Sequence, residues 1–541
     1  AADYTRRRDA PAANVALRLG GLSDTSPAPT GTNATFFNAG RGPPPISRPP
    51  FVSVDAPRCA TDAAFRAASL SCYGDAWVAE RGNNSVWTDR QGRRITPTNS
   101  LDLWGESLTV NWDSPIGLLT AISSHRAFTS TFYNDFDFTP YVIFHNNNVP
   151  YKQRQWSHEA QLSGSAWDER LDYVVGGYVF RERGLESVDQ LTPGDVPAAQ
   201  ASALAATLPY FQTTDRHIDN RSKALFGQLT VSPTRRLHLT AGLRLTDESK
   251  DYRVQQSRAA GPRLSATGRQ SSKIWTPSFN LAYQAWPQVL IYGAYAEGYR
   301  AGGFASRFPG GLPTPLPSYG PEFVNSYELG LKATALDRRL VVNLAAFRMG
   351  YDDIQVTAAV PNLPGFTLNL GKAEFTGFEA ESTLALTPRL TAGVFAGRTH
   401  KALTEVAPGT TAGGGTNVVV PITGDSRLPG PEWQAGLALT HATPLRRGGR
   451  LTTRIDVAYE SDDASAVANY AIIVRKAHAV ANLRLSYAAP REEWELAVGA
   501  RNLFDARYFT TKNLSPAAGS ASGTLGRPRE TYVEVSRRFG G

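Results

Sequence analysis

Aromatic and arginine side chains gather around one glycine-rich segment, residues 302–311, where Tyr299, Arg300, Phe304 and Arg307 lie close together in sequence. Arginine pairs with oxygen anions such as carboxylates, and aromatic rings stack on planar groups. These four residues are therefore candidate ligand contacts. The alternative is a row of interfacial aromatic rings beside solvated arginines. The glycine-rich segment lacks the Lys-Ser/Thr pair of a phosphate-binding loop, so we expect a mobile loop.

A second polar group lies at 145–151, where His145 and Tyr151 flank a run of three asparagines. Side chains of this kind can hydrogen-bond a ligand at a loop tip. An ordinary solvated loop has the same composition, and both interpretations stay open. His145 and Tyr151 complete the set of candidate binding residues.

The sequence offers little support for catalysis or for a bound metal. His158 and Glu159 suggest a zinc protease, but no histidine follows at the helical i+4 position, and the segment alternates like a strand. The eight histidines are scattered, with no pair at metal-ligand spacing. A GxSxG nucleophile motif is absent. We therefore expect no enzyme, no metal site and no cofactor.

Cys59 and Cys72 are the two cysteines of the chain. They bracket a short polar segment and do not form a CxxC pair. A lone pair of this kind predicts one disulfide and an oxidising compartment. Two unrelated thiols are the alternative.

The composition favours β-structure. Hydrophobic residues make up 41% of the 541 residues and charged residues 19%, while glycine (48 residues) and aromatics (10%) are abundant. This mixture disfavours a coiled coil, a helical bundle and a disordered chain. No apolar run is long enough for a transmembrane helix. The formal net charge is +8, but the arginines are spread along the chain, so we do not expect a nucleic-acid partner.

Alternation with a period of two residues recurs from residue 101 to the end. Along 378–386 the apolar series Phe378, Ala380 and Leu384 opposes Glu379 and Glu381. The same alternation gives one apolar face and one polar face to residues 493–501 and to residues 327–332. The charged residues of the polar faces, such as Glu328, Lys332, Glu379 and Glu381, are expected to face inward.

The connections between the predicted strands alternate between short and long. Short links such as 387–389, 232–234 and 286–287 alternate with long ones, as in a transmembrane barrel with short turns on one side and long loops on the other. The sequence therefore predicts an all-β, transmembrane antiparallel barrel with 18 strands present. The expected strands are 1–9, 101–114, 117–133, 152–165, 170–184, 216–232, 236–253, 271–286, 288–301, 322–334, 338–354, 371–386, 389–402, 429–444, 449–460, 475–488, 493–509 and 526–539.

Several segments resemble TonB-dependent outer-membrane receptors, in the order typical of that family. They are PEFVNSYELGLK (321–332), IYGAYAEGYRAGGF (291–304), FRMGYDDIQV (347–356), NLGKAEFTGFEAE (369–381), ARNLFDARYF (500–509), LHLTAGLRLTDESKDY (237–252) and HEAQLSGSAWDERLDYVVGGYVFRE (158–182). The resemblance covers residues 101–541 strongly and 1–100 weakly.

The resemblance implies a 22-stranded barrel filled by an N-terminal plug that carries a TonB-contact segment. We expect residues 1–541 to be the barrel domain of such a receptor, with 11–100 as a long extracellular loop and with the plug and about four first strands missing. The resemblance also implies that a ligand binds where the extracellular loops, the upper wall and the plug apex converge. It places the protein in the outer membrane, among outer-membrane lipid and lipopolysaccharide.

Function follows from the same resemblance. We expect uptake of a scarce, bulky nutrient, with a ferric siderophore as the first candidate and haem, cobalamin, a glycan or an aromatic compound as alternatives. An 18-stranded, porin-like diffusion channel and a soluble all-β binding protein are the alternatives from other classes.

Overall fold

The computed structural model describes the greater part of the chain. The described residues are 2–9, 14–19, 87–88, 94–95, 99–135, 145–191, 211–258, 262–305, 312, 315–360, 363–407, 411–412, 420–446, 448–465, 467, 474–515 and 520–538. They are almost entirely strand, and no helix among them is long and apolar enough to cross a bilayer.

Eighteen long strands form one antiparallel sheet, as the alternation predicts. Their bounds differ from the predicted ones by a few residues in most cases. They are β1 (Ala2–Asp9), β5 (Asn99–Ser114), β6 (Gly117–Asp135), β7 (His145–Ala166), β8 (Leu171–Leu191), β9 (Phe211–Thr234), β10 (Leu237–Arg258), β11 (Leu264–Trp286), β12 (Val289–Arg300), β15 (Glu322–Ala335), β16 (Leu340–Asp352), β19 (Gly371–Thr387), β20 (Leu390–Val406), β23 (Trp433–Pro444), β24 (Arg450–Glu460), β27 (His478–Ala488), β28 (Trp494–Arg501) and β31 (Glu530–Arg537).

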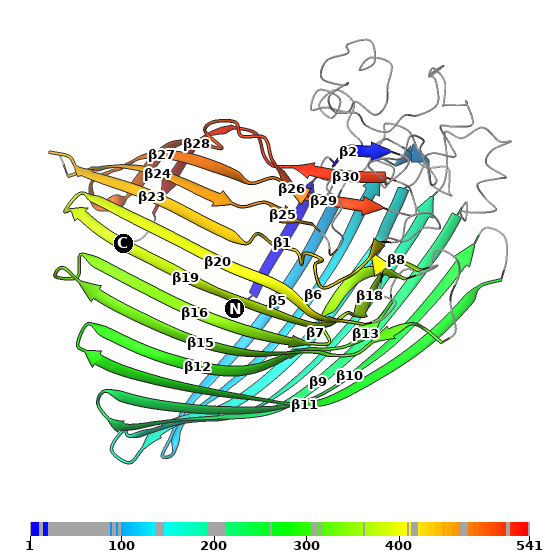
Figure 1. Cartoon of the computed structure of the whole chain (residues 1–541), viewed down its shortest axis with the longest axis horizontal. Coiled ribbons are helices and arrows are strands. Elements are labelled where there is room, and N and C mark those ends of the chain that lie inside the picture. Colours follow the sequence, from blue (N-terminus) through cyan, green and yellow to red (C-terminus); the bar gives the residue numbers. More distant parts are fainter. Residues whose placement is uncertain are drawn as a thin grey trace, which may run out of the picture.

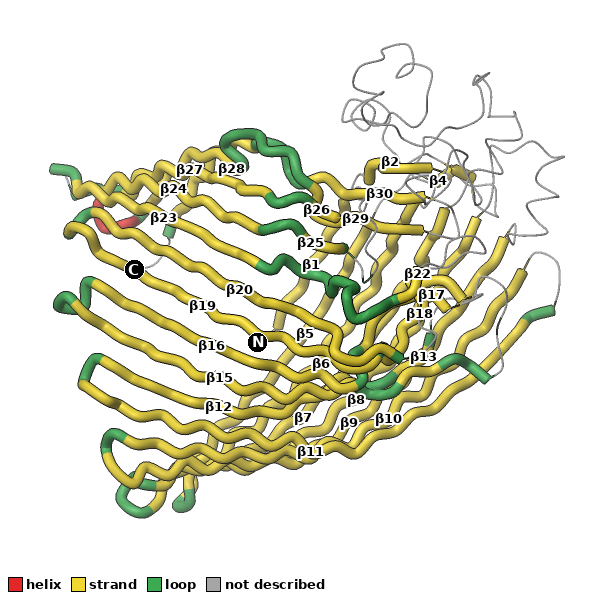
Figure 2. The backbone as a smooth tube through the Cα atoms, in the orientation of Figure 1, coloured by secondary structure: helices red, strands yellow, loops and turns green. Residues whose placement is uncertain are grey.

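Each of these strands pairs with the next one along the series from β1 to β31. The sheet curls back on itself, with β5–β9 behind and β12–β24 in front (Figure 1). Short turns lie at one end, and the long connections lie at the other (Figure 2). In the part of the chain that the structure describes, no register joins β1 to β31.

The long connections carry short strands that the alternation did not predict. These are β2 (Asn14–Leu19), β3 (Trp87–Thr88), β4 (Arg94–Ile95), β13 (Gly303–Phe304), β14 (Ser318–Tyr319), β17 (Gln355–Val360), β18 (Leu363–Asn369), β21 (Thr411–Ala412), β22 (Val420–Pro421), β25 (Asp463–Ala464), β26 (Val474–Arg475), β29 (Phe509–Ser515) and β30 (Ser520–Leu525). A 3-10 turn, η2 (Pro490–Glu492), lies between β27 and β28.

The expected strand at 493–509 is wrong at its loop end, since β28 stops at Arg501. Asn502 has a φ of 48° and Asp505 a φ of 52°, which end the extended conformation. The Asn502 side chain also accepts a hydrogen bond from the Ala506 amide at 2.8 Å and donates one to the Arg527 carbonyl at 3.0 Å. The polar side chain therefore builds a turn where the pattern suggested a longer strand.

The outward face of the sheet is largely apolar between two rows of tryptophan, with Glu106 and His158 just inside the upper row. Trp112, Trp167, Trp286 and Trp494 lie near the short turns, and Trp104, Trp156, Trp275 and Trp433 lie toward the long loops. Eight residues separate Trp104 from Trp112, and eleven separate Trp275 from Trp286. At about 3.3 Å per residue and a tilt of about 45°, these segments rise about 20–25 Å, the height of a bilayer's apolar band.

Side chains between these rows confirm the predicted two-sided pattern. Outward residues such as Leu225 (68% exposed) and Leu329 (63% exposed) are left uncovered by the described part of the protein, as expected of a lipid-facing surface. Glu328, Lys332, Glu379 and Glu381 lie on the opposite face by register, as predicted. The Tyr292 hydroxyl donates a 2.7 Å hydrogen bond to Glu328 on this inner face.

Lysine substitutions on the two faces of β9 are predicted to lower the free energy of unfolding by different amounts. Leu229 faces outward within the apolar band, while Gln228 faces inward. We expect Leu229→Lys to lower the free energy of unfolding from lipid vesicles by about 2–4 kcal/mol, because the ammonium must enter hydrocarbon. Gln228→Lys, the control, should change it by less than about 1 kcal/mol. Equal losses in urea titrations of the two variants would contradict the assignment of faces.

Candidate functional site

The inner face of β7–β10 continues above the apolar band and carries a dense set of polar side chains. By register, Tyr151, Glu186, Arg216 and Tyr252 come from four successive strands and share this inward face. We call this region the upper inner wall, with members Tyr151, Gln153, Glu182, Glu186, Arg216, Asn220, Lys250 and Tyr252.

Charge-assisted hydrogen bonds fix the polar groups of the upper inner wall. The Arg216 Nη1 donates to Glu186 Oε2 at 2.8 Å. Glu182 accepts from Gln153 Nε2 at 2.7 Å and from Asn220 Nδ2 at 2.9 Å. These bonds hold both carboxylates in fixed positions, since each bond to a charged group is stronger than a neutral one.

Burial changes the acidity of two tyrosines and one lysine here. Burial, followed by the charge of Glu186, raises the pKa of Tyr151. Burial also raises the pKa of Tyr252 to about 12. The same effect lowers the pKa of Lys250, whose side chain is half-buried. The wall therefore presents neutral phenols beside fixed charges at physiological pH.

The connection between β12 and β15 folds onto this wall. Phe304 stacks on Tyr252 with ring centroids 5.6 Å apart and planes only 5° from parallel. Tyr252, Val254, Ala305 and Leu316 form a buried apolar cluster around it. Lys250 Nζ also donates to the Gly302 carbonyl at 2.8 Å. Residues 302–305 of the expected mobile loop are therefore packed against this wall, and residues 306–311 lie outside the described part of the chain.

A glycine on β11 makes room for this ring. A Cβ at Gly268 would lie 2.3 Å from Phe304 Cε1, far inside van der Waals contact. Gln270, on the same inward face, donates to the Tyr319 carbonyl at 3.0 Å. β11 thus both accommodates and anchors the connection.

From the other side, Gln355 fixes the ends of the same connection. Its Nε2 lies 3.1 Å from the Ala301 carbonyl and 3.0 Å from the Gly320 carbonyl. Asn369 accepts from the Gly320 amide at 2.7 Å. These contacts hold the connection's two ends together above the barrel lumen.

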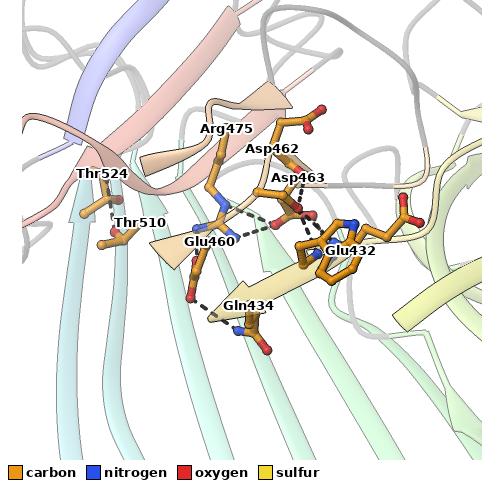
Figure 3. Close-up of polar contacts among 11 residues, drawn as sticks. Glu432, Gln434, Glu460, Asp462, Asp463, Arg475, Thr510 and Thr524 are labelled. Carbon is orange, nitrogen blue, oxygen red and sulfur yellow. Dashed lines mark hydrogen bonds and ion pairs between the residues drawn. The ribbon is translucent and has the colours of Figure 1, made fainter. Parts of the chain in front are cut away.

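A separate clasp joins the connections that follow β20 and β24 (Figure 3). Asp463 is 6% exposed and is paired with Arg475, which also approaches Glu460 at 3.7 Å. Asp463 Oδ1 accepts from the Gly430 amide at 2.6 Å. Because Asp463 is buried and its two carboxylate oxygens are bonded to Arg475 and to the Gly430 amide, we assign this cluster to loop positioning.

The structure brings two of the predicted candidate groups together. Tyr151 lies beside Glu186, which pairs with Arg216, and Arg216 lies near Tyr252, on which Phe304 stacks. This series of contacts connects Tyr151 to Phe304 across more than 150 residues of sequence.

The other predicted site residues lie apart from this series of contacts or outside the described residues. Tyr299 lies beside Thr246 and Glu248 of β10, and Arg300 is exposed while its carbonyl accepts from Gln355 at 3.3 Å. Arg307 and the proposed Cys59–Cys72 disulfide lie outside the described residues. His145 begins β7, but its side chain lies outside the described part.

Sequence reasoning missed Glu186, Arg216, Lys250 and Tyr252. Each has the inward parity of its strand, and this signal is readable in the sequence once the outward face is assigned. What the sequence lacks is the register, which sets Glu186 opposite Arg216 and places Tyr252 and Lys250 two and four residues along β10 from the partner of Arg216. Among the described residues, no group of three His, Cys, Asp or Glu side chains could hold a metal ion.

Comparison with known sequences identifies similar proteins. Residues 18–503 match the profile of the family described as TonB dependent receptor-like, beta-barrel. The ferric-pyoverdine M114 receptor PbuA of Pseudomonas sp. strain M114 is 24% identical over 381 residues, which are 67% of this chain and 43% of that protein. The metal-pseudopaline receptor CntO of Pseudomonas aeruginosa is 29% identical over 124 residues, 23% of this chain and 16% of that protein. The matches thus span less than half the length of either relative.

Solved structures share the fold. The ferric-catecholate import receptor Fiu of E. coli K12, in its closed form, matches with a TM-score of 0.65 at 13% identity, over 99% of this chain and 71% of that one. The ferric yersiniabactin uptake receptor FyuA of Yersinia pestis gives 0.64 at 18% identity, over 82% and 61%. At such identities the likeness concerns the fold alone.

Substitution of Gly268 is predicted to release the β12–β15 connection. In Gly268→Ala the new methyl group must displace Phe304 from Tyr252, so amide hydrogen exchange at 301–305 should accelerate, as it should in Phe304→Ala. Gly393→Ala is the matched control, because a Cβ there meets nothing within 4 Å. Unchanged exchange in both Gly268→Ala and Phe304→Ala would show that this stack does not hold the connection.

Proposed function

This chain belongs to the TonB-dependent receptor family of outer-membrane transport receptors, and we propose that it takes up a scarce, bulky nutrient, with a ferric siderophore as the first candidate. The observation that carries the proposal is the upper inner wall. Its fixed carboxylates, arginine and stacked aromatic rings face the lumen at the extracellular end. A large polar ligand offers many oxygen atoms to such groups.

The relatives support this choice of ligand. PbuA is named a ferric-pyoverdine receptor, and the similar structures include a ferric yersiniabactin uptake receptor and a siderophore receptor, PiuA of Acinetobacter baumannii. Copper transporter OprC also shares the fold, at 14% identity. The alternatives within the family are haem, a cobalamin, a glycan or an aromatic compound, because variable loops determine the ligand.

We propose that Tyr299, Arg300, Phe304, Arg307, His145 and Tyr151 contribute to ligand capture together with the upper inner wall. Arg300 is exposed at the loop end of β12 and can pair with carboxylate or catecholate oxygens. Phe304 contributes indirectly, because its ring is packed on Tyr252 and so positions the connection that borders the site.

Transport by the whole protein requires parts beyond this barrel. We propose that a plug, a TonB-contact segment and about four further strands accompany it, and that energised TonB remodels the plug after the ligand binds. The lengths of the relatives support this proposal, because the matched residues are only 43% of PbuA and 16% of CntO. Cys59 and Cys72 are proposed to form a disulfide in the long extracellular connection.

Uptake assays test the proposal directly. Cells that produce the whole receptor should accumulate iron from at least one member of a panel of hydroxamate, catecholate and carboxylate ferric siderophores. Accumulation should stop when TonB is deleted. A large, steady current of the purified receptor in a planar bilayer, without TonB-dependent uptake, would instead support passive diffusion.

Within the site, Arg216→Gln is predicted to weaken binding of the transported ferric siderophore by about tenfold, since one charge-assisted interaction is lost. Arg398→Gln is the control, because this arginine pairs with Glu432 at 2.7 Å on the outward face. Fluorescence quenching of the purified receptor measures both affinities. Equal affinities of Arg216→Gln and the unmodified receptor would remove Arg216 from the site.

A further inference from the structure

The long connections at the extracellular end of the barrel contact one another in the order of the sequence. We call the extracellular cap the described residues of the connections from β12–β15 to β28–β31, together with β2 of the first long connection. Contacts join each of these connections to the next. The cap therefore runs from the upper inner wall, where Phe304 stacks on Tyr252, around the rim to β2.

Three of the connections share one apolar core. Ile354 and Val356 come from the β16–β19 connection, Ile422 and Leu428 from the β20–β23 connection, and Val467 from the β24–β27 connection. All of these side chains are buried. A connection that leaves this core exposes apolar side chains of the other two to water, so burial stabilises the three connections together.

Residues 354–356 also join the apolar core to the β12–β15 connection, because successive side chains of an extended segment point in opposite directions. Ile354 and Val356 enter the core. Gln355 lies between them in sequence, is 8% exposed, and donates to the Ala301 and Gly320 carbonyls at 3.1 and 3.0 Å. A single short segment therefore links the core to the connection that carries Phe304.

Backbone amides bonded to side chains join the β20–β23 and β24–β27 connections. Ser461 Oγ accepts from the Glu432 and Trp433 amides at 3.1 and 3.0 Å. Asp463 accepts from the Gly430 amide at 2.6 Å and is buried. Separation of the two connections would break these bonds and would leave a buried carboxylate short of a donor, which is unfavourable.

The β28–β31 connection continues the series. Tyr508 stacks on His478 at the start of β27, with ring centroids 4.4 Å apart and planes 16° from parallel. Lys512 Nζ donates to the Val474 carbonyl of β26 at 2.9 Å. On its other side, β30 pairs antiparallel with residues 14–19 of β2. This connection is therefore tied both to the β24–β27 connection and to the first long connection.

We propose that the extracellular cap is one cooperative unit, whose connections open and close together over the upper inner wall. Segments that share a core and buried polar contacts open as a unit, because the first segment to leave removes the partners of the others. Opening at the Phe304 end uncovers Tyr252, so access to the wall depends on contacts as distant as those between β30 and β2. The proposal does not depend on the identity of the transported nutrient.

Amide hydrogen exchange of the whole receptor, purified in detergent from outer membranes, tests this cooperativity. Leu428→Ala removes a core side chain from the middle of the cap. We expect exchange to accelerate about tenfold or more in peptides from both ends of the cap, 301–305 and 520–525, and by similar factors, because the loss of a buried leucine destabilises the whole unit. The matched control is Leu437→Ala, which removes an outward-facing leucine from the strand that follows the same connection and should leave both ends unchanged.

Two further measurements complete the test. Heat-modifiable mobility in gels establishes that each variant is folded, and Asp463→Asn weakens the middle of the cap without loss of a core side chain if Leu428→Ala does not fold. At high pH, where exchange follows the opening rate itself, both ends of the cap in the unmodified receptor should open at one common rate. Unchanged exchange at either end in the folded variant, an equal acceleration in Leu437→Ala, or different opening rates at the two ends would overturn the proposal, since the connections would then open separately.

Discussion

The structure depends on the need of backbone amides and carbonyls for hydrogen-bond partners in a lipid environment that offers none. A chain that crosses lipid as strands must satisfy these groups strand by strand, and here seventeen successive antiparallel pairings do so. The alternation of side chains follows from that pairing, since neighbouring residues point to opposite faces. One face then meets hydrocarbon, and the other meets the lumen.

The same pairing continues past the apolar band and places charged side chains on both faces of the sheet there. Strands β7–β11 extend well beyond the length that a bilayer needs, so their upper parts can carry charge on both faces. Inward parity produces the wall of Glu186, Arg216 and Tyr252, and outward parity produces the cluster of arginines, including Arg181, around Asp219. Two clusters of charged side chains thus come from one sheet, and they differ in the face of the sheet on which they lie.

Much of the barrel was readable in the sequence because the constraint acts locally. Period-two alternation and the contrast between short and long connections predicted the strands to within a few residues over most of the chain. The errors have local physical causes: Asn502 turns the chain with its own side chain, and the upper strand ends are longer because pairing continues outside the lipid. In the site, Tyr151 and Phe304 were predicted as separate groups. Glu186, Arg216 and Tyr252 connect the two groups. This connection depends on the register of the strands and on the space that Gly268 leaves for the Phe304 ring, and a single sequence displays neither.

The central claim is that one face of each strand contacts hydrocarbon and the other contacts the aqueous lumen. A nitroxide side chain introduced at each position from 224 to 231 of β9, in receptor reconstituted into bilayers, measures this directly by collision with oxygen and with a water-soluble nickel complex. The structure predicts that oxygen collision peaks at 225, 227, 229 and 231, while the nickel complex reaches 224, 226, 228 and 230. Collision rates without alternation, or high nickel accessibility at Leu225 and Leu229, would contradict the account.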